Sequence, residues 1–233
     1  MLPFIISMYS NYLMHAYRYV AVGNEPFLMS YNGRFQAFVL PTVLNIQEAL
    51  GKADLATQIK VVVPCNPDVY HSKMPSKGTF RPDVNKTMQQ LVSFLNKNGS
   101  PFVVNISPFL NLYQNKNYSV DYAFIDNKAH PLVDGKNVYY NYFGGNLDTL
   151  ESALKKIGFG QMPIVVGQVG WPIDGGVNAT VSNAKRFIQG LVNHVISNKG
   201  TALRPGNAPV EAYIFSLVEE DKKSILHGNF ERH

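Results

Sequence analysis

The chain has 233 residues, of which 45% are hydrophobic and 16% are charged, and its formal net charge is +5. A charged fraction below the usual ~25% argues against a disordered chain or a coiled coil, and the length suits one globular domain with a sizeable core. The basic residues are scattered along the chain rather than gathered into a stripe, so the positive charge does not indicate a nucleic-acid partner.

The single cysteine, Cys65, lies in an apolar run, which predicts a buried thiol and excludes a disulfide framework. No group of cysteines and histidines has metal-ligand spacing, so we expect no metal and no cofactor. No apolar stretch reaches the ~18 residues that a membrane span needs. Residues 1–18 are an atypical lead segment. They are apolar, but they lack a basic start and contain interrupting polar residues, so they make no convincing signal peptide.

From residue 19 onward, short β-branched runs alternate with amphipathic stretches. The predicted strands are Tyr19–Gly23, Ile59–Pro64, Phe102–Ile106, Ile164–Gly170 and Val210–Leu217. The predicted helices are Phe35–Lys52, Val84–Lys97, Leu147–Ile157 and Val181–Ser197. Apolar strands that alternate with helices indicate an α/β fold with a parallel sheet covered by helices.

Two architectures accommodate five such units. One is an open, doubly wound sheet, and the other is a (β/α)₈ barrel without its first three units. No GxGxxG motif follows any predicted strand, which counts against a dinucleotide-binding open sheet. The predicted loops Asn66–Pro82 and Leu110–Asn146 are long and follow the carboxyl ends of strands, where a barrel builds its site.

Polar residues at two strand ends suggest carbohydrate chemistry. The first strand runs into Asn24-Glu25, and at the end of a barrel strand such a glutamate can protonate a glycosidic oxygen while the asparagine binds a sugar 2-hydroxyl. The alternative is a turn with a solvated glutamate. After the fourth strand, the Trp171 ring either stacks on a sugar or packs in the core.

Together these segments resemble the plant-type glucan endo-1,3-β-glucosidases of glycoside hydrolase family 17, over about residues 18–233. The motifs that carry the resemblance include RYVAVGNEPFL, VVVPCNPDVY, PFVVNISPFLNLY, PIVVGQVGWPIDGG, YIFSLVEEDKKS and GNFERH. The resemblance implies a partial (β/α)₈ TIM barrel of about five strands, corresponding to family strands 4–8, in one domain spanning residues 19–233. It further implies retaining hydrolysis of β-1,3-glucan by a secreted, monomeric protein of the cell wall, with no cofactor.

The resemblance assigns roles to individual residues. It implies that Glu25 is the general acid/base, that Asn24 contacts the sugar, and that Trp171 follows the nucleophile. Charged residues that surround the cleavage site in the family match three further positions, Glu220, Lys223 and Glu231. These three and Trp171 are therefore expected to help bind the substrate, although the charge run around Glu220 would by itself be interpreted as a solvated loop.

The nucleophile position departs from the family pattern. Relatives carry glutamate where this chain has Gln168, and a neutral amide cannot form the covalent glycosyl ester of a retaining enzyme. Ser107 and Gly144 also replace a tyrosine and an aspartate of the family motifs. Gln168 is thus an engineered knock-out, a sequence error, or the mark of an inactive relic, and the accompanying departures favour the relic.

Three hypotheses about function remain open: a β-1,3-glucan endohydrolase lineage, a non-catalytic glucan-binding module, and a non-functional product. A barrel arrangement predicts that Glu25 and Gln168 face each other at one end of the sheet, with side-chain ends roughly 4–7 Å apart. Five N-x-S/T sequons fit a secreted ancestry, but the sequon at Asn105 is disfavoured because it lies in a predicted strand.

Overall fold

In the computed structural model, the described residues are 17–114, 118–197, 199–206, 210–223 and 232, so most of the expected lead segment lies outside them. The main parallel strands are β1 (Tyr19–Ala21), β2 (Lys60–Val62), β3 (Pro64–Cys65), β6 (Phe102–Asn105), β9 (Ile164–Val169) and β10 (Glu211–Ile214). Only Val63 separates β2 from β3, so this run pairs with β1 on one side and with β6 on the other. Strand β6 then pairs with β9, and β9 with β10.

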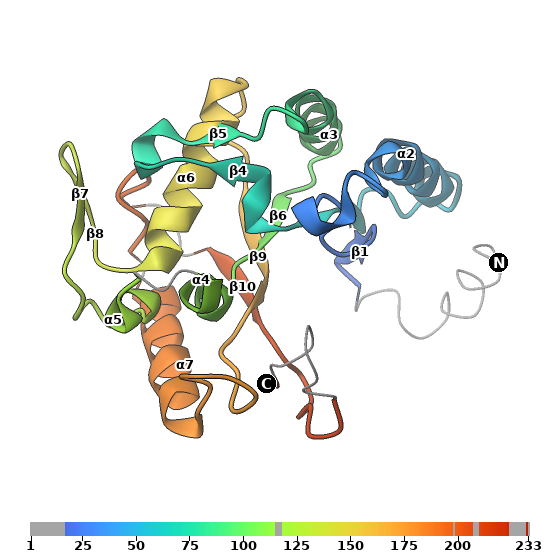
Figure 1. Cartoon of the computed structure of the whole chain (residues 1–233). Helices are drawn as coiled ribbons and strands as arrows, with labels where there is room; N and C mark the ends of the chain where they lie inside the picture. The colour runs from blue at the N-terminus through green and yellow to red at the C-terminus, as the bar shows by residue number, and fades with distance from the viewer. Residues whose placement is uncertain (1–16, 115–117, 198, 207–209, 224–231, 233) are drawn as a thin grey trace.

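The strand order distinguishes the two architectures considered from the sequence. All five predicted strands are confirmed, and they lie side by side in the order in which the chain makes them (Figure 1). A doubly wound sheet reverses its order at a switch point, whereas a barrel adds each strand next to the previous one. The described sheet is therefore part of a barrel wall.

Four long helices cover this sheet. They are α2 (Gln36–Lys52), α3 (Asn85–Lys97), α6 (Tyr142–Lys156) and α7 (Val181–Ile196), which confirms the predicted helices. Helix α6 begins five residues earlier than predicted because the Asn141 side chain caps it, accepting a hydrogen bond from the Gly144 amide. No helix within the described ranges is long and apolar enough to cross a membrane.

The long connections expected to be loops contain regular structure. They hold helices α4 (Pro108–Gln114) and α5 (Val120–Ala123), the hairpin of β4 (Tyr70–His71) with β5 (Thr79–Phe80), the hairpin of β7 (Leu132–Asp134) with β8 (Asn137–Tyr139), and the 3₁₀ turns η2 (Pro67–Val69) and η3 (Pro75–Lys77). A further 3₁₀ turn, η1 (Met29–Tyr31), follows β1. These elements are too short to give a clear periodic signal in the sequence.

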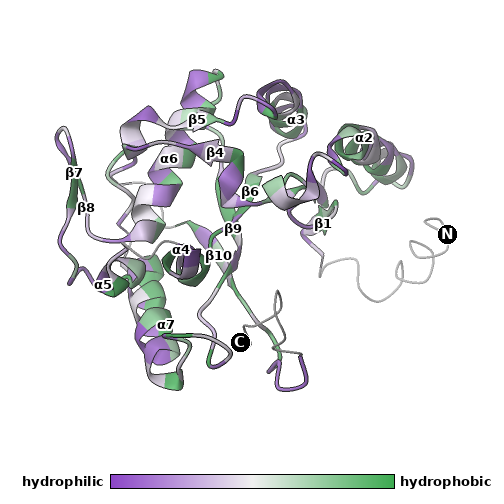
Figure 2. Cartoon of the chain, viewed as in Figure 1, coloured by the Kyte–Doolittle hydropathy of each residue, from purple (hydrophilic) through white to green (hydrophobic). Residues whose placement is uncertain are grey.

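The two faces of the sheet bury very different amounts of apolar surface. Alternate strand residues such as Val61, Val104 and Val166 join the main core against the helices, and the middle strands are coloured as hydrophobic in Figure 2. The opposite face holds a small cluster of Val62, Val103 and Val165 beside the partly buried ring of Tyr19. Because a barrel wall has a narrow inside and a broad outside, this asymmetry fits a barrel.

Side chains of the first and last strands meet across the concave side of the sheet. Arg18 Nη1 lies 2.8 Å from Glu211 Oε2, and the Tyr19 hydroxyl donates to the same oxygen at 3.4 Å. Such contacts between β1 and β10, which do not pair, require a sheet that curls strongly.

A one-residue bulge in β9 sets the register at the end of the sheet. Val104 pairs with Val166, but the next residue, Asn105, pairs with Gln168, so Gly167 is the extra residue. A Cβ atom at Gly167 would lie 2.6 Å from Cγ1 of Val103 and 3.1 Å from Oδ1 of Asn105. Glycine is therefore required here, and the bulge brings Gln168 beside Asn105.

We expect Gly167→Ala to destabilise the fold by about 1–3 kcal/mol, because the added methyl group overlaps Val103 in a packed region. The free energy of unfolding in urea measures the effect. Gly51→Ala is the matched control, since a Cβ at this position of α2 meets nothing within 4 Å and alanine favours the helix. Equal effects of the two substitutions would contradict the close approach at Gly167.

Candidate active site

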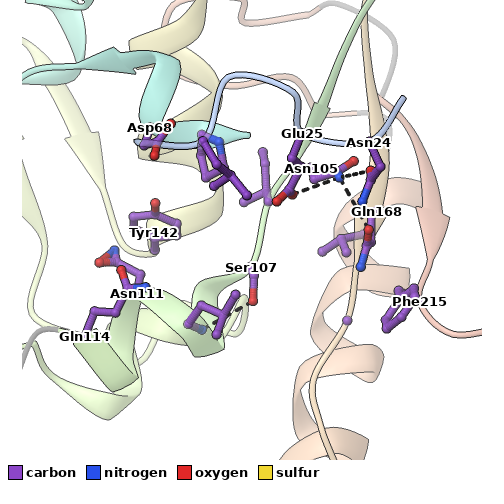
Figure 3. A pocket seen from close by; sticks show the side chains of 16 residues that line it. Asn24, Glu25, Asp68, Asn105, Ser107, Asn111, Gln114, Tyr142, Gln168 and Phe215 are labelled. Atoms are coloured by element: carbon purple, nitrogen blue, oxygen red, sulfur yellow. Dashed lines mark hydrogen bonds between the residues drawn. The ribbon is translucent and has the colours of Figure 1, made fainter. Parts of the chain in front are cut away.

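The carboxyl ends of the five strands surround a cleft of about 330 Å³ (Figure 3). The lining includes Glu25 after β1, Asp68 after β3, Asn105 on β6, Gln168 on β9 and Phe215 after β10. Because parallel strands point the same way, their carboxyl ends meet at one edge, and three of the predicted site residues, Asn24, Glu25 and Gln168, lie together there.

The Asn105 side chain connects the predicted site residues to one another. Its Nδ2 atom donates to Oε1 of Glu25 at 2.9 Å and to Oδ1 of Asn24 at 3.0 Å, and it lies 3.3 Å from Oε1 of Gln168. Figure 3 shows the three acceptors converging on this amide. Since both oxygens are bonded to one nitrogen, Oε1 of Glu25 and Oε1 of Gln168 are at most about 6 Å apart, a limit that includes the roughly 5–5.5 Å of retaining pairs.

The backbone after β1 aims Glu25 into the cleft. The Glu25 amide donates to the Pro64 carbonyl at 2.8 Å, so the chain continues alongside the neighbouring strand after β1 has ended. Gly23 and Glu25 both have left-handed backbone conformations, with φ of 68° and 52°. For a glutamate this conformation is unfavourable, and its presence at a strand end is typical of a functional turn.

The environment of Glu25 favours its neutral form. Burial raises the pKa of this carboxyl, the hydrogen bond from Asn105 lowers it in part, and the negative charge of Asp68 raises it again. A raised pKa shifts this carboxyl toward the protonated form, which is the form that a general acid needs.

Asp68 is the other carboxylate of the cleft, and it is already bonded. Its Oδ1 lies 3.0 Å from Nη1 of Arg81, and its Oδ2 accepts a hydrogen bond from the Met29 amide at 3.2 Å. Among the described residues that line the cleft, Glu25 and Asp68 are the only acidic ones.

Comparison with known proteins identifies the family. The profile of "Glycosyl hydrolases family 17" matches residues 7–233. The chain belongs to this family. It is 51% identical over 218 residues to "Glucan endo-1,3-beta-glucosidase 5" of Arabidopsis thaliana, covering 93% of this chain and 45% of the relative. It is 38% identical to "Glucan endo-1,3-beta-glucosidase" of Vitis vinifera, covering 90% of this chain and 60% of that relative.

Solved structures of the family share the fold. The β-1,3-glucanase and pollen allergen CJP38 of Cryptomeria japonica matches with a TM-score of 0.84 and 36% identity, over 92% of this chain and 67% of that one. A plant β-glucan endohydrolase matches with a TM-score of 0.81 and 31% identity, over 98% of this chain and 74% of that one. The chain thus spans about half the length of its most similar Arabidopsis relatives and about two thirds of a solved family barrel.

The proposed sugar-stacking role of Trp171 is wrong for the described structure. The ring is only 2% exposed and stacks on Phe124 with centroids 4.6 Å apart, while Phe109 and Phe187 contact it from other sides. Its Nε1 donates to the Asn178 carbonyl at 3.0 Å. The core therefore holds the ring, whereas the backbone just before it, at Gly170, lines the cleft.

Two charged residues predicted to bind substrate, Glu220 and Lys223, lie in the described part of the chain after the last strand but are not brought to the cleft. Glu220 and Lys223 form an ion pair of 3.3 Å, and neither belongs to the cleft lining. Glu231 lies outside the described residues. A substrate-binding role for these three positions stays a prediction.

Sequence reasoning missed several residues of the cleft, among them Asn105, Asp68 and Tyr142. Asn105 was noted only as a sequon, although a polar residue ending a buried strand is a signal that could have identified it. Tyr142 enters the cleft from the first turn of α6, and its hydroxyl accepts a hydrogen bond from Asn146 at 2.9 Å. The sequence did not indicate Tyr142 because the apolar periodicity predicts a helix only from Leu147, five residues after α6 begins.

We expect Trp171→Ala to destabilise the protein by about 3–5 kcal/mol, since it empties a large, buried aromatic site. Urea denaturation followed by circular dichroism measures the loss without using tryptophan fluorescence. Phe38→Ala on α2 is the control: its side chain is exposed, and a change within about 0.5 kcal/mol is expected. A loss at Trp171 as small as at Phe38 would contradict the core assignment.

We expect Glu25→Gln to gain stability relative to the parent as pH rises from about 4 to 7. Because the native pKa of Glu25 is raised, its favourable contribution is complete below the unfolded pKa of about 4.3 and is lost as pH rises through the native pKa. Urea unfolding at several pH values measures this trend.

Glu48→Gln is the control with the opposite sign. Exposed Glu48 pairs with Lys52 at 2.6 Å, which lowers its pKa, so its contribution is present above the unfolded pKa and is lost as pH falls. If the stabilities of the two variants, each relative to the parent, changed with pH in the same direction, the environment of Glu25 would not favour its protonated form.

Proposed function

We propose that this chain binds β-1,3-glucan in the Glu25 cleft and does not hydrolyse it. The observation that carries the proposal is Gln168, a neutral amide bonded to the same Asn105 nitrogen as Glu25 and facing the acid across the cleft. The cleft thus keeps the geometry of a retaining pair and lacks one of its two carboxylates.

The chemistry of retaining hydrolysis explains why this lack is decisive. Glu25, with its raised pKa, is suited to protonate the leaving glycosidic oxygen. The second carboxylate must attack the anomeric carbon and form a glycosyl ester that water later cleaves. The Gln168 carboxamide has neither the charge nor the nucleophilicity for this step. The reaction would stop at protonation of a bond that nothing then attacks.

Asp68 is a poor substitute for the missing nucleophile. One of its oxygens pairs with Arg81, and the other accepts the Met29 amide. Both oxygens of this carboxylate are therefore already engaged by hydrogen-bond donors, one of them charged, which hold the group in place.

The lining of the cleft supports saccharide binding. Side-chain amides of Asn24, Asn111, Gln114 and Gln168, together with Tyr142, face the same cavity. Amide and phenol groups both donate and accept, which matches the hydroxyl groups of a neutral sugar. The relatives named above are glucan endo-1,3-β-glucosidases, so we infer that β-1,3-glucan is the ligand and that the plant cell wall is where the protein meets it.

We expect laminari-oligosaccharides to bind, with heat measurable by calorimetry, and to release no reducing sugar over hours of incubation. Loss of a covalent nucleophile lowers turnover on the order of 10⁴–10⁶-fold, which takes an ordinary glycosidase below detection. Asn24→Ala should weaken binding, because it removes a polar group at the centre of the cleft. A β-1,4-linked glucan oligosaccharide of the same length is the ligand control.

Two outcomes separate the hypotheses. Sugar release that Glu25→Ala abolishes would show an active hydrolase and refute the proposal. Absence of any saccharide binding would refute it in favour of a non-functional product.

A further inference from the structure

Asn105 occupies an unusual position for a polar residue. It ends the buried central strand β6, is itself only 5% exposed, and contacts side chains from two other segments, one after β1 and one on β9. The packing that surrounds it leaves little freedom, since a Cβ at Gly167 would already be 3.1 Å from its Oδ1. The neighbouring strand β9 therefore restricts where the Asn105 amide can lie.

We propose that Asn105 is the positioning residue of this cleft, and that its amide couples the charge of Glu25 to the placement of Gln168. This inference deepens the proposed function by naming what sets the geometry of its site, and it does not depend on glucan being the ligand.

The coupling follows from a count of hydrogens. The Asn105 amide nitrogen has two hydrogens, yet three oxygens lie within bonding distance, on Glu25, Asn24 and Gln168. An ionised carboxylate attracts a hydrogen more strongly than an amide oxygen does, and the Gln168 contact is the longest of the three at 3.3 Å. When Glu25 is protonated, its hold on the Asn105 hydrogen weakens, and Gln168 competes better for it.

Among the described residues, the other ionisable groups near Glu25 do not donate a hydrogen bond to its carboxyl. Asp68 faces Glu25 from the turn η2 and is paired with Arg81. Cys65 on β3 is fully buried, and burial together with the charge of Glu25 raises the pKa of its thiol, so it stays neutral. Within the described residues, Asn105 is the hydrogen-bond donor to the Glu25 carboxyl.

The same contacts explain how a glutamine fits at the nucleophile position without disturbing the cleft. Oε1 of Gln168 accepts from Asn105 in the way that one oxygen of a glutamate would. The substitution therefore removes charge while it retains this contact.

Nuclear magnetic resonance of the intact chain tests the coupling. We expect the side-chain amide signals of Asn105 to shift with pH along a single titration curve. The midpoint of this curve should equal the midpoint measured for the carboxyl carbon signal of Glu25. Glu25→Gln should abolish the Asn105 titration. The side-chain amide of Asn146 is the internal control. It is hydrogen-bonded to the hydroxyl groups of Tyr70 and Tyr142 rather than to Glu25, so its signals should not follow that curve.

Asn105→Ala adds a test of direction. If Asn105 acts through its hydrogen bond, the substitution should raise the pKa of Glu25, because the hydrogen bond lowers it. If Asn105 only fills space, water would enter the vacated volume and lower the pKa of Glu25. The direction of the pKa change therefore distinguishes a positioning role from simple packing. Asn146→Ala, which removes a comparably bonded amide elsewhere, should leave the Glu25 titration unchanged.

The proposal is overturned if the Asn105 amide signals do not follow Glu25, or if Asn105→Ala lowers the pKa of Glu25. Should Asn105→Ala fail to fold, Gln168→Leu replaces it. Removing one competing acceptor should then strengthen the Glu25 contact and lower its pKa, and a rise would contradict the competition. None of these readouts requires saccharide binding, so they remain informative even if the glucan proposal fails.

Discussion

The hydrogen bonding of the Asn105 amide is the interaction on which the cleft depends. A buried amide without partners costs about 1–3 kcal/mol, so a polar residue at the end of a buried strand is tolerated only where acceptors converge on it. Three acceptors converge here because a bulge at Gly167 shifts Gln168 into register and a left-handed turn brings Glu25 back over the sheet. The two backbone irregularities and the one buried amide form a single arrangement.

The partial barrel keeps most of its core on the outside of the sheet. The main cluster joins the strands to helices α2, α3, α6 and α7, whereas the inner face holds only a few valines beside Tyr19. Since apolar burial stabilises a fold roughly in proportion to area, the outer layer carries most of the stability of the described strands. The inner side is supplemented by the contact of Arg18 and Tyr19 with Glu211, which links the first strand to the last.

The Glu25 carboxyl lies in an environment that favours its protonated form. Burial raises the pKa of Glu25 and Asp68 adds to the effect, so a proton-donating carboxyl persists without a charged residue at position 168. Glu25 and Gln168 share one hydrogen-bond donor, the Asn105 amide, although only Glu25 can ionise. In this chain of family 17, the polar lining of the cleft and the Glu25 carboxyl thus occur together with a neutral side chain at position 168.

The sequence by itself determined the elements and the family of this protein. Five strands and four helices were predictable because β-branched runs and 3.6-residue periodicity persist over long segments, and the motifs around Glu25 and Gln168 indicated family 17. The roles of Asn105 and Trp171 were decided by the tertiary structure alone. Whether an indole ring packs in the core or stacks on a sugar, and whether an amide contacts three other side chains, depends on residues far away in the chain. Phe187 is 16 positions from Trp171 and Asn24 is 81 positions from Asn105, and no local pattern relates them.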